Sequence, residues 1–424
     1  MDPHIRSTNR VTTNDIPRRH TNSIQLDVPA HVLRIKAAIR RDETLIRLGG
    51  DAFGYATTWL SDDRQLISIC DGCGWPEVPK SRYWSSRLFA LAGDPGSADT
   101  QEIDSYPEVP LWAYMSGSLP PYLSLSILAV EGRIYQYLST SSFGTRNNHL
   151  NGAKLIYSPD NGRSWYNQNG STPVALDSYR DQSLDTMAFL QEPQNAFSIL
   201  TFLQMGKDYQ ENRDGYVYVY SPNGITEETM TELVMFRVRK AQVLHREAYE
   251  YYAGRSTDGD ARWSKDVHER RVVHSFPRGL MMPAFPMAWQ PCVVYNAALD
   301  VYLMVNSNSS NGTCEANQAT YLGIWAAANP WGPWRQVHEE KAWLPGGDPN
   351  ARAAWPQIPP KWIAADGKTF WLTWTDVQST VHGTDSEPGT EVVNEQSLTR
   401  SRRQWRQSYP HFALNAQRVN LTLE

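Results

Sequence analysis

Five tight turns, each lying between two alternating apolar segments, constrain the fold of this chain more than any other feature. Each turn is acidic or contains glycine, and the segment after it alternates apolar and aromatic residues, as QLISIC, IYQYL and YVYVYS do. This pattern predicts β-hairpins, because successive residues of a strand face opposite sides and acidic or glycine residues suit tight turns. The five turns are Ser61–Arg64, Glu131–Arg133, Arg213–Gly215, Ala298–Asp300 and Ala365–Lys368.

The spacing of these hairpins predicts a β-propeller. Neighbouring turns are separated by roughly 70 to 85 residues, which fits propeller blades that carry long loops. A propeller repeats one sheet per unit around an axis, so hairpins at a constant period favour it over a sandwich. We therefore expect an all-β fold with a single propeller over residues 31–424, most simply of five blades, preceded by a flexible N-terminal segment, residues 1–30. Six or seven blades stay open if one spacing contains two repeats.

One motif supports this fold. Residues 158–165 read SPDNGRSW and fit the pattern S-x-D-x-G-x-[ST]-W, which resembles the Asp box of sialidases and other propeller glycosidases. In such a turn we expect Asp160 to cap the backbone, Gly162 to adopt a positive φ and Trp165 to fill the gap between sheets. Asp160 is therefore interpreted as structural and not catalytic.

Charge and aromatic content narrow the classes of partner. The net charge is −5 and no basic face stands out, which argues against a nucleic-acid partner. No apolar run reaches membrane-spanning length, so we expect no membrane partner either. The chain contains 16 Trp and 21 Tyr but 11 Phe. Rings with a polar edge suit both sugar-binding surfaces and packing between blades. We expect a polysaccharide or oligosaccharide partner, and a monomer or weak oligomer.

The sequence constrains the cellular compartment and the bound metal ions of this protein less than it constrains the fold. About the first 25 residues are polar and lack the apolar core of a signal peptide, whereas an extracellular location would suit a polysaccharide-degrading protein. We expect no cofactor, although an oxygen-lined propeller channel would suit a structural calcium ion. Cys70 and Cys73 form a C-x-x-C without a second such pair, which indicates a local disulfide or two thiols more than a zinc site.

Strand polarity selects the candidate catalytic carboxylates. If inner strands begin at the funnel of a propeller, the hairpin turns lie at the opposite end, and their acidic residues are excluded. Asp51 precedes the strand AFGYATTWL and Asp71 follows QLISIC, so both are expected at the funnel end of the first blade. Glycoside hydrolysis requires two such carboxylates. A structural role in strand entry or chain reversal stays open for both residues. Asp376, after TFWLTW, is a candidate substrate-binding carboxylate.

The same reasoning adds further candidates. Arg146 and His149 follow the second strand of the second blade, where His149 is a candidate catalytic base and Arg146 a candidate for binding a uronate. Four residues open the innermost strands of the fourth and fifth blades, where they would stack on a sugar ring or bond its hydroxyls. They are Trp289, Gln290, Trp355 and Gln357. Packing in the core is the alternative for each of them.

Several stretches together resemble a group of propeller proteins long labelled only as a domain of unknown function. Among them are GGDAFGYATTW, KDYQENRDGYVYVYS and KWIAADGKTFWLTW. The group includes endo-acting enzymes that cleave D-arabinan, so the resemblance implies a propeller glycosidase. It highlights Asp51 and Asp71, in agreement with strand polarity. It also highlights Tyr209 and Arg213 as substrate-binding residues, although the hairpin geometry places these two away from the funnel.

Three functions follow from these features. The first is a glycoside hydrolase that uses the paired carboxylates of the first blade. The second is a polysaccharide lyase that acts on a uronate by β-elimination, with His149 and Arg146 at the reacting sugar. Its tyrosine would be Tyr122 or Tyr220. The third is a non-catalytic propeller that binds glycans through its tryptophans.

Overall fold

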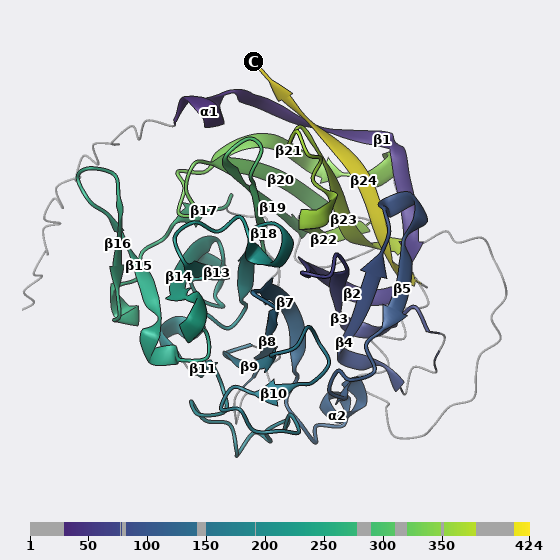
Figure 1. Ribbon diagram of the computed structural model, residues 1–424, viewed down its shortest axis with the longest axis vertical. Coiled ribbons are helices and arrows are strands. Elements are labelled where there is room, and N and C mark those ends of the chain that lie inside the picture. The colour runs from purple at the N-terminus through teal and green to yellow at the C-terminus, as the bar shows by residue number, and fades with distance from the viewer. Residues whose placement is uncertain are drawn as a thin grey trace, which may run out of the picture.

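In the computed structural model, five antiparallel sheet units follow one another along the chain, and the fifth also includes β1 (Ile35–Gly49) from its beginning (Figure 1). The structure describes residues 29–76, 78, 82–141, 150–190, 192–277, 290–309, 320–348, 352–378 and 411–424. The first unit comprises β2 (Asp51–Trp59), β3 (Gln65–Gly74), β4 (Trp84–Ala92) and β5 (Asp99–Glu102). The second comprises β7 (Leu123–Val130), β8 (Arg133–Thr140), β9 (Gly152–Ser158) and β10 (Tyr166–Asn167).

The remaining units follow in chain order. The third comprises β12 (Thr201–Gln204), β13 (Tyr216–Pro222), β14 (Glu232–Arg239), β15 (Glu250–Arg255) and β16 (Ala261–Ser264). The fourth comprises β18 (Cys292–Asn296), β19 (Val301–Ser309), β20 (Thr320–Ala327) and β21 (Arg335–Trp343). The fifth comprises β22 (Arg352–Gln357), β23 (Thr369–Gln378), β24 (His411–Leu423) and β1 (Ile35–Gly49).

Short strands and helices accompany these five units. The short strands are β6 (Val109–Pro110) beside β4, β11 (Phe189–Leu190) beside β9 and β17 (His274–Ser275) beside β14. The α-helices are α1 (Ala30–Leu33), α2 (Leu111–Met115) and α3 (Glu227–Met230). In the described part of the chain, no helix has the length and apolar character needed to cross a membrane. The predicted flexible segment 1–30 lies outside the described residues apart from its last two.

The prediction of an all-β chain with five hairpins is confirmed. β2 pairs with β3, β7 with β8, β12 with β13, β18 with β19 and β22 with β23, in every case antiparallel. The connections contain residues with positive φ, among them Asp63, Glu131 and Asp300. Acidic residues tolerate this conformation better than β-branched or bulky ones, which explains why the turns are readable in the sequence.

The inner strands of the units share one direction. Figure 1 shows β2, β7, β18 and β22 near the middle of the molecule, with β5, β10, β16 and β21 farther out. β12 and β18 pair in parallel and join the third and fourth units into one sheet. The hydroxyl of Thr58, near the end of β2, accepts the backbone N–H of Ala129, near the end of β7, at 2.8 Å. We call the end where these strands begin the entry end, and the opposite end, with Asp63, Glu131 and Asp300, the turn end.

The two ends of the described chain meet in the fifth unit. β24 lies between β23 and β1, so the first strand of the chain pairs with the last. On β1, Arg40 donates from Nε and Nη2 to the two carboxylate oxygens of Glu340 at 2.5 and 2.8 Å. Glu340 belongs to β21, and the ion pair therefore joins the outer strands of the fourth and fifth units. Burial alone would raise the pKa of Glu340, but hydrogen bonds with His338 and Arg40 outweigh it and lower the pKa to about 2.

The turn over residues 158–165 has the predicted structural role. Asp160 Oδ1 accepts the backbone N–H of Ser164 at 2.9 Å, and Oδ2 accepts its hydroxyl at 2.6 Å. Gly162 has a φ of 90°. Trp165 is buried and meets the ring of Tyr106, from the first unit, edge to face at 5.0 Å. The carboxylate of Asp160 is therefore occupied by its own turn.

Replacing Glu340 tests the closure of the fifth unit. We expect Glu340→Gln to lower the free energy of unfolding by about 2 kcal/mol at pH 7, because Arg40 loses a charged acceptor in a partly buried site. A carboxyl with a lowered pKa stabilises the fold above its unfolded-state pKa, and this stabilisation is lost as the pH falls. The difference between wild type and variant should therefore shrink between pH 4.5 and about 2.

Urea unfolding at several pH values measures this difference. The matched control is Lys36→Met, which breaks the exposed pair between Lys36, also on β1, and Glu424 and should cost less than about 1 kcal/mol. Equal losses in the two variants would contradict a special role for the Arg40–Glu340 pair.

Candidate functional site

Asp51 lies at the entry end, as predicted, at the first position of β2. It is half-buried and opposite Gly74 of β3. The hydroxyl of Tyr83, the residue before β4, donates to Asp51 Oδ2 at 2.6 Å. Tyr83 is itself buried. A carboxylate that accepts a bond from a buried phenol has a fixed orientation, which a catalytic carboxylate needs.

Asp71 lies on the neighbouring strand near the same end. Ala52 pairs with Gly72, so Asp71 stands across from Phe53, and a bulge separates this rung from the Asp51–Gly74 rung. Asp71 is half-buried and has a φ of 55°. The register thus brings the backbones of the two predicted residues to one end of the first unit.

The charge of Asp51 affects the buried side chain of Tyr55. Tyr55 is buried, and its hydroxyl donates to the carbonyl oxygen of Phe412 at 2.8 Å. Burial, followed by the nearby charge of Asp51, raises the pKa of Tyr55 well above its usual value. Tyr55 is therefore a neutral donor that fixes β24 against β2, not a proton donor for catalysis.

Trp355, on β22, packs against β2, the strand that begins with Asp51. Its ring meets that of Phe53 at 4.9 Å between centroids, edge to face. A Cβ atom on Gly54 would lie 2.5 Å from Cε3 of Trp355, so the absence of a side chain at Gly54 makes room for the indole. Trp355 has a φ of 57°, a rare conformation for a bulky residue. Such strained residues occur often at binding sites.

One other predicted residue, Asp376 on β23, is placed by its backbone. The carbonyl oxygen of Ala52 accepts the hydroxyl of Thr375 at 3.0 Å, which brings the end of β23 next to the start of β2. Asp376 is the next residue and pairs with Ala353 and Ala413. The chain therefore carries a third acidic residue to the entry end, beside Asp51.

The glutamines differ in exposure. Gln290 is buried, and its amide nitrogen donates to the carbonyl oxygen of Leu125. Gln357 is half-buried and opposite Thr373 on β23. Trp289, Arg146 and His149 lie outside the described residues, so their predicted roles stay predictions.

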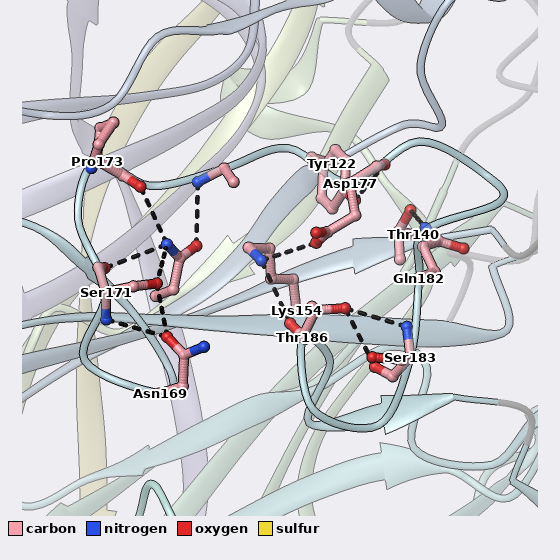
Figure 2. Close-up of polar contacts among 12 residues, drawn as sticks. Tyr122, Thr140, Lys154, Asn169, Ser171, Pro173, Asp177, Gln182, Ser183 and Thr186 are labelled. Carbon is pink, nitrogen blue, oxygen red and sulfur yellow. Dashed lines mark hydrogen bonds and ion pairs between the residues drawn. The ribbon is translucent and has the colours of Figure 1, made fainter.

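A buried ion pair shapes the entry end of the second unit (Figure 2). Lys154 on β9 is 1% exposed and meets Asp177 Oδ2 at 2.8 Å and the carbonyl oxygen of Thr186 at 3.3 Å. The hydroxyl of Tyr122, just before β7, donates to the carbonyl oxygen of Asp177 at 2.8 Å. Gln182 donates to the hydroxyl of Thr140 at 3.2 Å. These contacts hold the long connection between β10 and β11 against the starts of β7 and β9.

Tyr209 and Arg213 lie at the turn end, as the hairpin geometry predicts. Both belong to the connection between β12 and β13. Tyr209 is buried, and its hydroxyl donates to the carbonyl oxygen of Tyr216 at 3.3 Å. The guanidinium of Arg213 lies 6.0 Å from the ring centroid of Tyr295. These contacts pack the turn and place both residues at the end opposite to Asp51.

Cys70 and Cys73 form no disulfide with each other, and no metal-binding cluster is found among the described residues. Cys70 and Cys73 are buried and not joined to each other, and the thiol of Cys73 donates to the carbonyl oxygen of Gly74 at 3.7 Å. Across the described ranges, no group of three or more His, Cys, Asp or Glu side chains is arranged to hold a metal ion.

Sequence reasoning missed two residues at this end, Tyr83 and Trp112. Tyr83 lies in no repeat or motif, and its contact with Asp51 depends on how β4 begins. Trp112 lies on α2 and is 54% exposed. An isolated tryptophan after the proline-rich stretch YPEVPL was the only available signal for it.

Comparisons with known proteins give a family but no activity. The family model described as "Domain of unknown function (DUF4185)" matches residues 123–409, more than half of the chain. No curated protein matches in sequence. Among solved structures, the catalytic domain of the Coprinopsis cinerea GH62 α-L-arabinofuranosidase is 8% identical over 88% of this chain and 92% of its own, with a TM-score of 0.41. The α-L-arabinanase of Cellvibrio cellulosa is 13% identical over 78% and 88%, with a TM-score of 0.43. Likenesses this distant carry no inference about activity or substrate.

Gly54 tests the placement of Trp355. We expect Gly54→Ala to displace the indole and to lower the free energy of unfolding by about 1–3 kcal/mol, because a well-packed site must shift to accept the new methyl group. Tryptophan fluorescence and urea unfolding measure the two effects. Gly96→Ala is the control, since a Cβ there meets nothing within 4 Å. An unchanged Gly54→Ala variant would show that Trp355 does not occupy this position.

Proposed function

We propose that this chain, which belongs to the family described as the domain of unknown function DUF4185, is a glycoside hydrolase that cleaves a polysaccharide at the entry end of its first unit. The observation that carries the proposal is the register of β2 and β3, which brings Asp51 and Asp71 to one end of two paired strands. The five sheet units are the blades of a five-bladed propeller in this proposal, and the entry end is its funnel.

The two carboxylates take different roles. Asp51 accepts the Tyr83 hydroxyl and takes the role of nucleophile or general base, which acts on the anomeric carbon directly or through a water molecule. Asp71 takes the role of general acid and donates a proton to the glycosidic oxygen as the bond between that oxygen and the anomeric carbon breaks. Tyr83 is a positioning residue, since it acts through Asp51.

The surrounding residues provide the sugar-binding surface. Phe53 and Trp355 form an aromatic edge beside the carboxylates, and rings of this kind stack on the C–H faces of sugars while polar neighbours bond the hydroxyls. The proposed polar residues are Gln290, just before β18, Gln357 on β22 and Asp376 on β23. Trp289, Arg146 and His149 complete the proposed set. The sequence resemblance to endo-acting enzymes makes D-arabinan the first polysaccharide to test.

No observation favours elimination over hydrolysis. The hydroxyls of Tyr122 and Tyr220 donate to the carbonyl oxygens of Asp177 and Pro330. Burial raises the pKa of both tyrosines above their usual value. A buried tyrosine that is bonded to the backbone is a poor catalytic acid or base.

Substitution of the carboxylates tests the proposal. Incubation with D-arabinan and a panel of neutral and uronate-containing polysaccharides should release reducing ends without the ultraviolet absorbance of unsaturated uronates. Asp51→Asn and Asp71→Asn should each lower kcat at least about a hundredfold, because each removes an acid or base from the reaction. Asp366→Asn makes the same chemical change at the turn end and should keep full activity.

Two results would contradict this reading. Retained activity in Asp51→Asn would exclude its role, provided that urea unfolding shows a folded variant. Release of unsaturated products would replace hydrolysis by elimination.

Tyr83→Phe separates positioning from chemistry. We expect kcat to fall about tenfold with little change in KM, because the variant keeps the ring but loses the hydrogen bond that orients Asp51. Steady-state kinetics on the cleaved polysaccharide measures the two constants. A rise in KM alone would instead indicate that Tyr83 contacts the substrate.

A further inference from the structure

Trp112 is held outward at the same end of the first blade as Asp51. Its side chain is 54% exposed, whereas its neighbours Leu111 and Ala113 are buried. The backbone N–H of Leu111 donates to the carbonyl oxygen of Tyr83 at 2.9 Å, and the hydroxyl of Tyr83 reaches Asp51. Trp112 is therefore linked to the proposed catalytic carboxylate through its neighbour Leu111 and through Tyr83, which bonds both Leu111 and Asp51.

The backbone around Trp112 is fixed on both sides. Leu111 packs with Cys73 and Tyr83 in a small apolar cluster. The carbonyl oxygen of Ala113 accepts the backbone N–H of Ser118 at 3.0 Å and its hydroxyl at 2.9 Å. The indole of Trp112 is thus presented on an anchored helix, and stacking on it would require little ordering of the backbone.

Trp75 and Trp84, the other tryptophans of this region, use their rings and Nε1 groups in contacts with neighbouring residues. Trp75 Nε1 donates to the carbonyl oxygen of Leu48 at 2.9 Å, and its ring meets that of Phe89 at 5.2 Å. Trp84 Nε1 donates to Glu108 at 2.8 Å, and the guanidinium of Arg87 lies 5.1 Å from its ring. Among the described residues, the Trp112 side chain makes no hydrogen bond and no ring contact. An exposed, anchored indole beside a candidate active site is a feature that core packing does not explain.

We propose that Trp112 is the platform of a distal subsite that stacks on one sugar residue of a bound polysaccharide, beyond the residue that is cleaved. The inference rests on the proposed function, because it takes Asp51 as the cleavage point. The substrate is then a polymer that lies across the first blade from Asp51 toward α2, and short substrates that end at the cleavage point do not reach Trp112.

The length of the substrate tests this role. For D-arabinan, or whichever polysaccharide of the panel is cleaved, Trp112→Ala should raise KM about tenfold and leave kcat nearly unchanged, since stacking is lost without any change to the carboxylates. For the short substrate 4-nitrophenyl α-D-arabinofuranoside, or the aryl glycoside of the cleaved sugar, the variant should equal wild type. Trp112→Phe should recover most of the affinity for the polymer.

The control is Leu184→Ala, which removes another large exposed side chain, 49% exposed, from the second unit. It should change neither constant. A Trp112→Ala variant with an unchanged KM for the polymer, or with equal losses on the long and short substrates, would overturn the proposed subsite.

Binding separates this inference from the proposed function. Affinity electrophoresis through gels that contain each polysaccharide measures binding without catalysis. Retardation of wild type but not of Trp112→Ala, in the absence of cleavage, supports sugar stacking on Trp112 but rejects the hydrolase and, with it, the position of the subsite relative to a cleavage point. Cleavage with no dependence on Trp112 supports the hydrolase and rejects the subsite. Neither retardation nor cleavage on any polysaccharide rejects both.

Discussion

Directional hydrogen bonds between buried side chains set the register of the inner strands, and the position of the candidate site depends on them. Thr58, on β2, accepts the N–H of Ala129 on β7 and donates to Gln204 on β12 at 2.9 Å, so one hydroxyl joins three units. Gln204 donates in turn to the carbonyl oxygen of Ile127 at 2.8 Å. Apolar packing between sheets is non-directional, but an unpaired buried polar group costs about 1–3 kcal/mol, so this network excludes alternative registers.

The sequence predicts the parts of the fold that depend on local chemistry. Turn residues such as Asp63 and Glu131 adopt positive φ, and this preference is visible without any knowledge of the fold. Strand polarity then placed Asp51 and Asp71 at the same end, because a hairpin returns its second strand to where its first began. The closing pair β1–β24 was not predicted, since it joins segments almost a whole chain apart and neither segment contains a hairpin signal.

Contacts across the width of a sheet could not be predicted from the sequence either. Tyr83 reaches Asp51 because the beginning of β4 pairs with the end of β3, and Leu111 reaches Tyr83 because β6 pairs with the beginning of β4. No motif encodes that pairing. The sequence resemblance in turn highlighted Tyr209 and Arg213, whose contacts in this chain lie within and beside their own turn. A shared stretch of sequence identifies residues that matter to a family, but the three-dimensional contacts distinguish packing from a place at the entry end.

Asp51 at the entry end and Asp63 at the turn end are held by different partners, which argues for Asp51 as the reactive one of the two. At the turn end, Asp63 lies 2.8 Å from Lys361 and 3.3 Å from Lys207, and its pKa is lowered to about 2, with Lys361 as the main cause. A carboxylate paired with two ammonium groups has its charge neutralised and its oxygens occupied. Asp51 is instead held by the neutral hydroxyl of Tyr83, which orients the group and leaves its negative charge uncompensated by that partner. Such a carboxylate retains the charge that an oxocarbenium-like transition state requires beside the anomeric carbon.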